Sequence, residues 1–238
     1  MVSFSVILPA AGASLRFGGG KLIADLLGQP VIVRTINAFL PRADVAEIIV
    51  ATSQREQIEA CIAALQHADV ILNSPKLRWC AGGATRAHTV QNAAQVSREN
   101  WLAIHDAARP LVSQELIDAV FAAAIEQGAA APALPVSVTI KEVAAPLPSR
   151  VIRTLPRRTL AAMQTPQCMK REILLAALAN CPIPLDEVTD DVQLLELIGH
   201  PVMLVPGEEQ NLKLTTRMDA RIASEWLQSP SQTGESQT

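Results

Sequence analysis

The stretch VILPAAGASLRFGGGKL (residues 6–22) joins a short apolar run to a loop that holds four glycines and ends with a lysine. The small residues at 10–14 let a ligand approach the backbone closely, and their N–H groups can point toward phosphate oxygens. Arg16 and Lys21 add positive charge on the two sides of the glycines. The stretch therefore predicts a strand followed by an anion-binding loop. The alternative is a tight turn that carries two solvated cations.

Two familiar phosphate-binding loops do not fit these residues. In the P-loop pattern G-x-x-x-x-G-K-S/T, Leu15 stands in place of the first glycine and Leu22 in place of the hydroxyl residue. In the dinucleotide pattern G-x-G-x-x-G, Ser14 and Phe17 stand in place of the second and third glycines. The sequence therefore argues against a P-loop NTPase and against a Rossmann dehydrogenase.

The composition predicts a globular protein with a local anion site. Of the 238 residues 49% are hydrophobic, and the net charge of -3 provides no general basic field. Aromatic residues make up 3%, which disfavours nucleic-acid binding by base stacking. We expect the scattered cysteines to be reduced thiols, because their spacing fits neither a disulfide framework nor a zinc site. The N-terminus lacks a signal-peptide pattern and no apolar run is long enough for a membrane span, so we expect a soluble, cytoplasmic protein without membrane contact.

Short apolar runs alternate with segments of helical periodicity along the first part of the chain. The predicted strands are residues 4–10, 47–52, 69–73, 101–107 and 129–136. The predicted helices are residues 30–40, 55–66, 85–96 and 114–127, the last with Ser113 as its N-cap and Gly128 at its end. Because the strands are continuously apolar, they are typical of a parallel sheet covered on both faces. We therefore predict a doubly wound α/β fold, in which ligands bind at the carboxyl ends of the strands.

The rhythm changes after residue 139. Residues 139–164 contain two strand-like pieces around a proline-containing turn, which predicts a β-arm that projects from the main sheet. Helices are then predicted at 170–180, 189–199 and 215–227, with a strand at 201–207. We expect a single domain over residues 1–227, without a second catalytic domain, and a disordered polar tail at 228–238.

Six further motifs follow the loop in order. They are GGATRAHTV (82–90), HDAARP (105–110), TIK (139–141), QTPQ (164–167), TDD (189–191) and NLKLT (211–215). Together with the loop they resemble the 2-C-methyl-D-erythritol 4-phosphate cytidylyltransferases of non-mevalonate isoprenoid biosynthesis, from Ile7 to about Leu227. The ribitol 5-phosphate cytidylyltransferases share much of the pattern. The resemblance implies a Rossmann-like nucleotidyltransferase fold of the nucleotide-diphospho-sugar transferase type, a three-layer sandwich whose β-arm builds a homodimer.

The resemblance also implies the reaction and its residues. The phosphate of a polyol phosphate attacks the α-phosphorus of CTP, and pyrophosphate leaves. Arg16 and Lys21 match the loop cations that stabilise the triphosphate and the transition state. The residues that match the CTP site are Ala10, Ala11, Gly12, Ala13, Ser14, Gly82, Gly83, Arg86, Thr89, Asp106 and Ala107.

A second group of residues matches the acceptor site of the family. It consists of Asp106, Arg109, Thr139, Arg157, Thr165 and Lys213. Arg157 and Lys213 are expected to hold the attacking phosphate in line, and Thr139 and Arg157 to act in the partner's site through the arm. Asp106 is expected to hold Mg²⁺. For His105 we favour a structural role over metal or acid–base chemistry.

Two aspartates, several departures from the family pattern and the alternative functions complete this interpretation. For Asp190 and Asp191 we favour a helix N-terminus with a structural contact over a metal pair. The chain departs from the family in a shorter loop, in Ser14 and Leu22, and in a proline-rich arm, although none of these changes removes a required charge. The alternatives are the same chemistry on ribitol 5-phosphate, another nucleotidyltransferase, and a non-catalytic CTP-binding protein. None of these alternatives predicts nucleic acid as a partner.

Overall fold

The computed structural model describes residues 2–12 and 15–228. Its central sheet consists of β1 (Phe4–Pro9), β4 (Val45–Thr52), β5 (Leu77–Ala81), β6 (Trp101–Ile104), β7 (Ala129–Pro135), β10 (Ala161–Met163), β11 (Gln167–Lys170) and β12 (Met203–Pro206). The strand order is β10-β7-β11-β6-β1-β4-β5, and β12 pairs with β7. The pairs of β1 with β4 and β6, of β4 with β5 and of β7 with β12 are parallel. The fold is therefore α/β with a mostly parallel sheet, as predicted.

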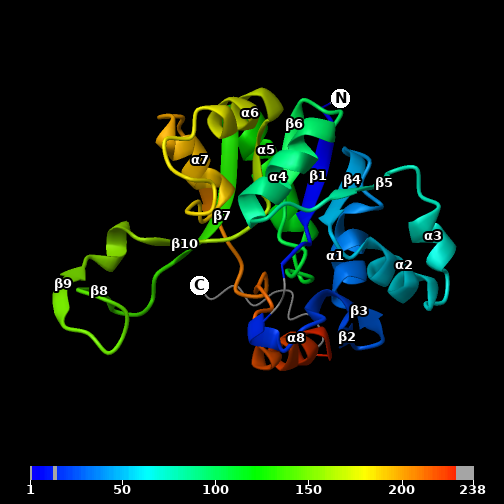
Figure 1. Ribbon diagram of the computed structural model, residues 1–238, viewed down its shortest axis with the longest axis horizontal. Helices are drawn as coiled ribbons and strands as arrows, with labels where there is room; N and C mark the ends of the chain where they lie inside the picture. Colours follow the sequence, from blue (N-terminus) through cyan, green and yellow to red (C-terminus); the bar gives the residue numbers. More distant parts are fainter. Residues whose placement is uncertain (1, 13–14, 229–238) are drawn as a thin grey trace, which may run out of the picture.

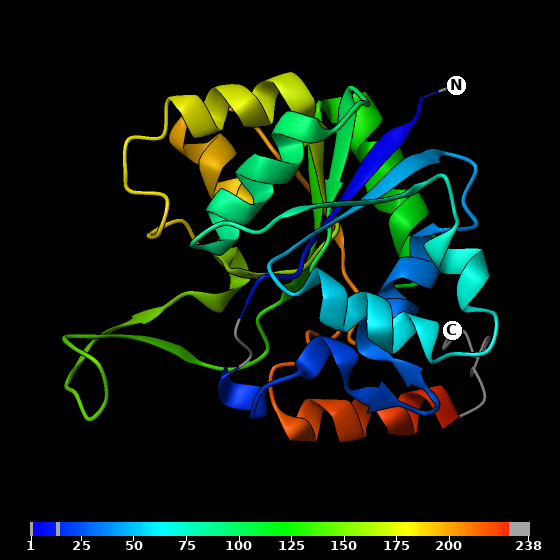
Figure 2. The same cartoon turned by 45° about the vertical axis from the view of Figure 1, so that its right-hand side comes forward.

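Helices cover both faces of this sheet (Figures 1 and 2). They are α1 (Val31–Phe39), α2 (Arg55–Ala63), α3 (Ala68–Leu72), α4 (Arg86–Val96), α5 (Gln114–Gln127), α6 (Arg171–Ala179), α7 (Asp191–Leu197) and α8 (Arg217–Gln228). Alternate residues of β1 contribute to two separate cores. Val6 and Leu8 join the core that includes α1 and α5, whereas Ile7 joins the core with α4, α6 and α7. Burial on both faces explains why the strand is continuously apolar.

The predicted ends of helix α5, with Ser113 as the N-cap and Gly128 after the last turn, are confirmed. The Ser113 hydroxyl accepts a hydrogen bond from the N–H of Leu116, and Gly128 ends the helix with a φ of 91°. A side-chain acceptor at the first turn and a glycine of positive φ at the end are the usual ways of satisfying helix termini.

One predicted strand is wrong. Residues 69–73 belong to helix α3, which begins after His67 in a left-handed conformation, and the strand at this place is β5. The short apolar run at residues 70–72 has no feature that separates a strand from a short helix, and only Ile71 of α3 is buried. By contrast, β5 (LRWCA) is only partly buried, because it is the edge strand beside β4. Its sequence therefore lacks the apolar run on which the prediction depended.

A second difference concerns residues 167–170, which form β11 although the sequence pattern predicts no strand there. This strand lies between β6 and β7 and runs antiparallel to both. Because β11 is antiparallel to β6, its first residue, Gln167, lies opposite Ile104 at the carboxyl end of β6. The end of the QTPQ motif is thereby placed at this edge of the sheet.

Two small hairpins stand outside the central sheet. One is β2 (Asp25–Leu26) with β3 (Gln29–Pro30), which follows the turns η1 (Leu15–Phe17) and η2 (Lys21–Ile23). The other is β8 (Ile140–Val143) with β9 (Val151–Leu155), followed by the turn η3 (Arg157–Thr159). The β8–β9 hairpin projects to one side of the molecule, away from the helices (Figures 1 and 2).

Candidate active site

The loop after β1 forms one wall of a pocket at the carboxyl end of the sheet. Ala10, Ala11 and Gly12 line it, whereas Ala13 and Ser14 of the predicted cradle lie outside the described residues. Among the described residues, no atom outside Gly12 and its chain neighbours lies within 4 Å of a Cβ built on Gly12. The space beside Gly12 therefore allows a ligand to approach the loop closely.

The β5–α4 connection forms the opposite wall, where Gly83 lines the pocket and Gly82 lies next to it. A Cβ on Gly82 lies 2.5 Å from the Cβ of Ala11, and one on Gly83 lies 2.5 Å from the Cβ of His88. These glycines thus allow the β5–α4 connection to pack against both the loop and the helix. The N–H of Gly83 donates to the hydroxyl of Thr89 at 2.9 Å, and that hydroxyl donates to the carbonyl of Thr85 at 2.8 Å. The predicted Thr89 is therefore held in the pocket wall.

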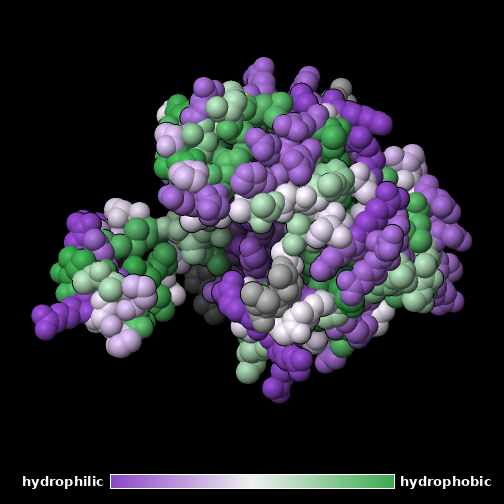
Figure 3. All heavy atoms as spheres, viewed as in Figure 1, coloured by the Kyte–Doolittle hydropathy of each residue, from purple (hydrophilic) through white to green (hydrophobic). Residues whose placement is uncertain are grey.

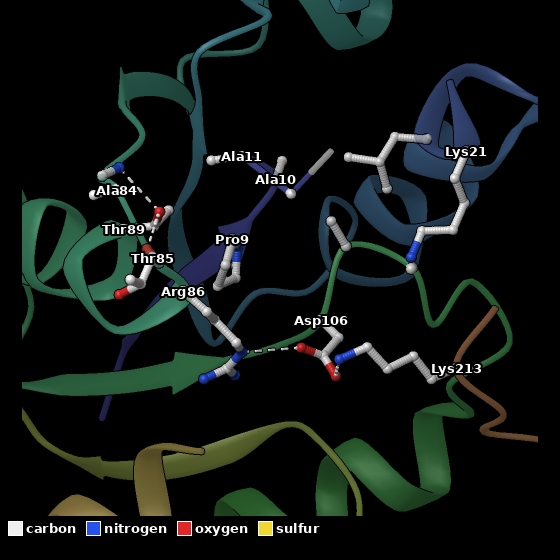
Figure 4. Close-up of a pocket in the computed structure, with 15 residues that line it drawn as sticks. Pro9, Ala10, Ala11, Lys21, Ala84, Thr85, Arg86, Thr89, Asp106 and Lys213 are labelled. Atoms are coloured by element: carbon white, nitrogen blue, oxygen red, sulfur yellow. Dashed lines mark hydrogen bonds and ion pairs between the residues drawn. The ribbon is translucent and has the colours of Figure 1, made fainter. Parts of the chain in front are cut away.

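Asp106 is the centre of the charged site. Its Oδ1 lies 3.3 Å from the Nε of Arg86, and its Oδ2 lies 3.3 Å from the Nε of Arg109 and 3.0 Å from the Nζ of Lys213. Burial alone raises the pKa of this carboxyl, but the three cations together hold its pKa well below the ordinary range. Figure 4 shows the carboxylate between the side chains of Arg86 and Lys213, which approach it from α4 and from the segment before α8.

Arg86 also contacts a second carboxylate. Its Nη2 lies 2.8 Å from Oδ2 of Asp191, the first residue of α7. Burial raises the pKa of Asp191, while the positive charge of Arg86 opposes that rise. Asp190 accepts a hydrogen bond from the N–H of Gln193 as the N-cap of α7. The interpretation as helix N-terminus and structural contact therefore agrees with the contacts of both aspartates.

His105 orders the loop that carries Asp106. Its Nδ1 lies 3.1 Å from the hydroxyl of Thr165, and its Nε2 lies 3.0 Å from the carbonyl of Arg109. The same hydroxyl accepts a hydrogen bond from the N–H of Asp106 at 3.0 Å. Burial lowers the pKa of His105 to about 4, so the ring is neutral near pH 7. A neutral ring with both nitrogens engaged supports a structural role.

Two adjoining pockets meet at this cluster, because Arg86, Asp106 and Lys213 line both of them. The first pocket has a volume of about 380 Å³ and contains the predicted CTP residues Ala10, Ala11, Gly12, Gly83, Arg86, Thr89, Asp106 and Ala107, together with Lys21. The second has a volume of about 290 Å³ and contains the predicted acceptor residues Asp106, Arg109, Thr165 and Lys213. The hydropathy surface shows hydrophilic side chains in the hollow between the sheet and the lower part of the molecule (Figure 3).

Lys21 faces the first pocket from the other side (Figure 4). Burial lowers the pKa of Lys21, and the nearby charge of Lys213 lowers it further. Arg16 is exposed and lies outside both linings, although its charge also lowers the pKa of Lys21. Lys21, Arg86 and Lys213 outnumber the single lining carboxylate Asp106, so the first pocket is positive. Such a pocket suits a polyanion.

Two predicted acceptor residues do not reach these pockets. Thr139 and Arg157 are exposed residues beside the β8–β9 hairpin, and Nη1 of Arg157 donates to the carbonyl of Ser137 at 2.6 Å. Neither residue lines either pocket of its own chain. Gly82 also lies outside the linings, next to Gly83.

The structure adds polar residues that the sequence interpretation did not single out. Gln164, Gln167 and Thr189 line the second pocket, and Asn211 donates from Nδ2 to the carbonyl of Thr165 at 2.8 Å. Their signal was present, because Gln164 and Gln167 belong to the QTPQ motif and Asn211 to the NLKLT motif. Of these two motifs, the resemblance assigns only Thr165 and Lys213 to the acceptor site.

A divalent cation fits the site only together with a ligand. Within residues 2–12 and 15–228, no three histidine, cysteine or acidic side chains form a metal-binding group. Asp106 is ionised and lines both pockets. A single carboxylate combined with substrate phosphates is a usual mode of Mg²⁺ binding. In the same described part of the chain, no helix is long and apolar enough to cross a membrane.

The fold and the site define an α/β protein with a positively charged pocket at the carboxyl edge of its sheet. Residues 4–229 match the family model of 2-C-methyl-D-erythritol 4-phosphate cytidylyltransferase. The enzyme of that name from Symbiobacterium thermophilum is 39% identical over 93% of this chain and 92% of its own. The one from Synechococcus elongatus is 40% identical over 92% of this chain and 93% of its own.

Solved structures agree with these relatives. The 2-C-methyl-D-erythritol 4-phosphate cytidylyltransferase from Francisella tularensis has a TM-score of 0.78 and 29% identity, covering 94% of this chain and 99% of its own. The one from Thermus thermophilus has a TM-score of 0.74 and 30% identity, covering 96% of this chain and 100% of its own. The chain belongs to the 2-C-methyl-D-erythritol 4-phosphate cytidylyltransferase family, a family of nucleotidyltransferase enzymes.

Proposed function

We propose that this protein transfers CMP from CTP to 2-C-methyl-D-erythritol 4-phosphate, with release of pyrophosphate, as a step of isoprenoid biosynthesis. The observation that carries this proposal is the pair of pockets that meet at Asp106, Arg86 and Lys213. A donor triphosphate in the first pocket and a polyol phosphate in the second bring their phosphate groups together at this shared cluster. The family names of the relatives supply the identities of the two substrates.

The reaction joins two anions, so its main requirement is positive charge. Lys21, Arg86 and Lys213 surround the boundary of the first pocket and offset the repulsion between the two phosphates. Arg16 adds charge from the outside of the glycine loop. The attacking phosphate is already ionised at neutral pH, so no side chain has to remove a proton. His105 is buried, neutral and hydrogen-bonded on both nitrogens, which agrees with a mechanism without a general base.

We assign Mg²⁺ to Asp106 together with the phosphates of the bound nucleotide. The ion supplies charge neutralisation of the triphosphate. Lys213, which lies 3.0 Å from Oδ2 of Asp106 and lines the second pocket, would bind the acceptor phosphate there. Arg109 stays in place, because its Nη1 also donates to the carbonyl of Asn211 at 2.6 Å.

A homodimer formed through the arm accounts for Thr139 and Arg157. Both are remote from the pockets of their own chain, and the arm exposes apolar side chains at Val138, Leu147, Val151 and Ile152. Apolar surface is visible over the arm in Figure 3. Burial of these side chains against a second copy brings Arg157 to the acceptor pocket of the partner.

The experiment that tests the function is pyrophosphate release by the purified protein with CTP and Mg²⁺. We expect release that depends on 2-C-methyl-D-erythritol 4-phosphate and exceeds release with ribitol 5-phosphate by about 100-fold, because the ribitol chain is one carbon longer and lacks the methyl branch. Release with ribitol 5-phosphate alone would move the protein to a different acceptor. CTP binding without release in either reaction would instead indicate a non-catalytic protein.

A further inference from the structure

Asp191 is a buried carboxylate that lines neither pocket but contacts a residue that lines both. Its exposed fraction is 1%. Its Oδ2 accepts a hydrogen bond from Nη2 of Arg86 at 2.8 Å, whereas its Oδ1 has no hydrogen-bond partner among the described residues. A buried carboxylate oxygen without a partner costs free energy of folding. Stability alone therefore does not explain an acid at this position.

The start of α7 does not require this carboxylate either. Asp190 is the N-cap and accepts from the N–H of Gln193 at 3.0 Å. The side-chain carbonyl of Gln167 accepts from the N–H groups of Asp191 and Val192, at 2.9 and 3.1 Å. The first turn of the helix is thus satisfied without Oδ1 or Oδ2 of Asp191.

The carboxylate does fix the orientation of Arg86. The planar guanidinium of Arg86 is held at Nη2 by Asp191 and at Nε by Asp106, with distances of 2.8 and 3.3 Å. Asp191 provides the shorter contact, and Asp106 is shared with Lys213 and Arg109. Two carboxylates on different nitrogens leave a guanidinium little freedom to rotate.

We propose that Asp191 is a positioning residue for the transfer reaction, which holds Arg86 at the boundary of the two pockets so that its guanidinium faces the reacting phosphates. This inference rests on the proposed function. Without Asp191, the guanidinium of Arg86 keeps only the 3.3 Å contact of its Nε with Asp106, so it gains freedom to rotate away from the phosphates.

The first test is the variant Asp191→Asn, which keeps the shape of the side chain and removes its charge. We expect kcat to fall roughly 10- to 100-fold because a misplaced cation loses transition-state contacts, while the melting temperature changes by less than about 3 °C. Asp191→Asn added to Arg86→Lys should lower kcat no further than Arg86→Lys alone, because Asp191 acts through Arg86. Additive losses would contradict the proposal.

Glu47→Gln is the matched control. Glu47 is 3% exposed, accepts from Ser5 and pairs with Arg78, and it lies near the amino end of β4, at the other end of the sheet. This variant also removes a buried carboxylate that holds an arginine. We expect a lower melting temperature and unchanged kcat. If Asp191→Asn behaves in the same way, Asp191 is structural and the proposal is wrong.

A readout that does not need turnover separates this inference from the proposed function. In the ¹⁵N-labelled protein, the Nε–Hε group of Arg86 should give an ordered NMR signal in the wild type and a more mobile one in Asp191→Asn. An unchanged order of Arg86 in the variant would overturn the inference, whether or not pyrophosphate is released. A lack of pyrophosphate release by the wild type would overturn the proposed function alone.

Discussion

Single residues determine the charge of this site, because Asp106 gathers Arg86, Arg109 and Lys213 within 3.3 Å of its oxygens. Lys21 stands apart from this cluster. Among the described residues, no carboxylate lies within ion-pair distance of Lys21, although it lines the first pocket. A cation that forms no ion pair with the described residues of a positive pocket contributes little to folding. It is available for an anionic ligand.

Lys21→Ala should therefore separate activity from stability. We expect kcat to fall about 10²- to 10³-fold, since one cation that stabilises transition-state charge is lost, while the melting temperature stays within about 3 °C of the wild type. Steady-state kinetics and thermal unfolding measure the two effects. An unchanged kcat, or a loss of activity that follows unfolding, would remove Lys21 from the mechanism.

Lys76→Ala provides the control for this substitution. Nζ of Lys76 donates to the carbonyls of Leu40 and Arg42, at 3.1 and 2.6 Å, and the residue lies outside both pockets. We expect this variant to lose melting temperature and to keep its kcat. A Lys21 variant with the same profile would have only a structural role.

The charged residues of the site could be selected from the sequence because their motifs resemble those of a known family, and Asp106 in addition follows a predicted strand. The resemblance assigned Asp106, Arg109 and Lys213 to the acceptor site, and the structure brings them into contact. The role of Asp191 was not predictable in detail. Its contact with Arg86 joins residues 105 positions apart, which depends on the packing of α7 against the sheet. Local patterns contain no information about such a contact.

At the scale of elements, the sequence predicts the strands that are buried on both faces of the sheet and misses a strand that is only half-buried. The central strands β1 and β4 are continuously apolar and were recognised, whereas the edge strand β5 is half-buried and was not. The run at 69–73 predicts a strand from its three apolar residues Val70, Ile71 and Leu72, but so short a run fits a helix equally well. The edge strand β5 is therefore determined by its pairing with β4 and not by the local sequence preference of its residues.

A buried ion pair at the amino end of β4 predicts the acid limit of stability. Burial alone raises the pKa of Glu47, but hydrogen bonds from Ser5, Arg78 and the N–H of Arg98 lower it below the ordinary value overall. Because the folded pKa is depressed, the unfolded chain binds more protons as the pH falls through this range. The contribution of Glu47 is therefore complete above its ordinary pKa and is lost as the pH falls toward its folded pKa.

Urea unfolding between pH 3 and pH 7 measures this contribution. We expect the free energy of unfolding of the wild type to fall below about pH 4.5, and that of Glu47→Gln to start lower and fall less steeply over the same range. Equal slopes for the two proteins would show that Glu47 does not titrate with folding. The comparison isolates Glu47, since the other carboxylates are common to both proteins.

At the scale of the whole molecule, the role of the projecting arm determines whether one chain is sufficient to form a complete active site. Arg157 lies on η3 after the β8–β9 hairpin, where it is exposed and lines neither pocket of its own chain. The sequence predicts the arm and its residues, but the geometry between two copies depends on a surface that one chain does not contain. If Arg157 serves the partner, two inactive variants must complement one another.

Co-expression of Arg157→Ala with Lys213→Ala tests this arrangement. Each variant alone should be nearly inactive, whereas the mixture should regain roughly a quarter of the wild-type activity, because a mixed dimer has one complete site. Different affinity tags on the two chains verify that mixed dimers form. If purified mixed dimers are inactive, Arg157 does not act in the partner's site.

The most direct measurement of the central claim follows the label in CTP during the reaction with 2-C-methyl-D-erythritol 4-phosphate. Two parallel reactions use CTP labelled with phosphorus-32 at the α- or at the γ-phosphate. Attack at the α-phosphorus predicts that the α label appears in a cytidine-containing product of the acceptor and the γ label in pyrophosphate. The γ label in the acceptor product, or the α label only in free CMP, would contradict cytidylyl transfer at the pockets that meet at Asp106.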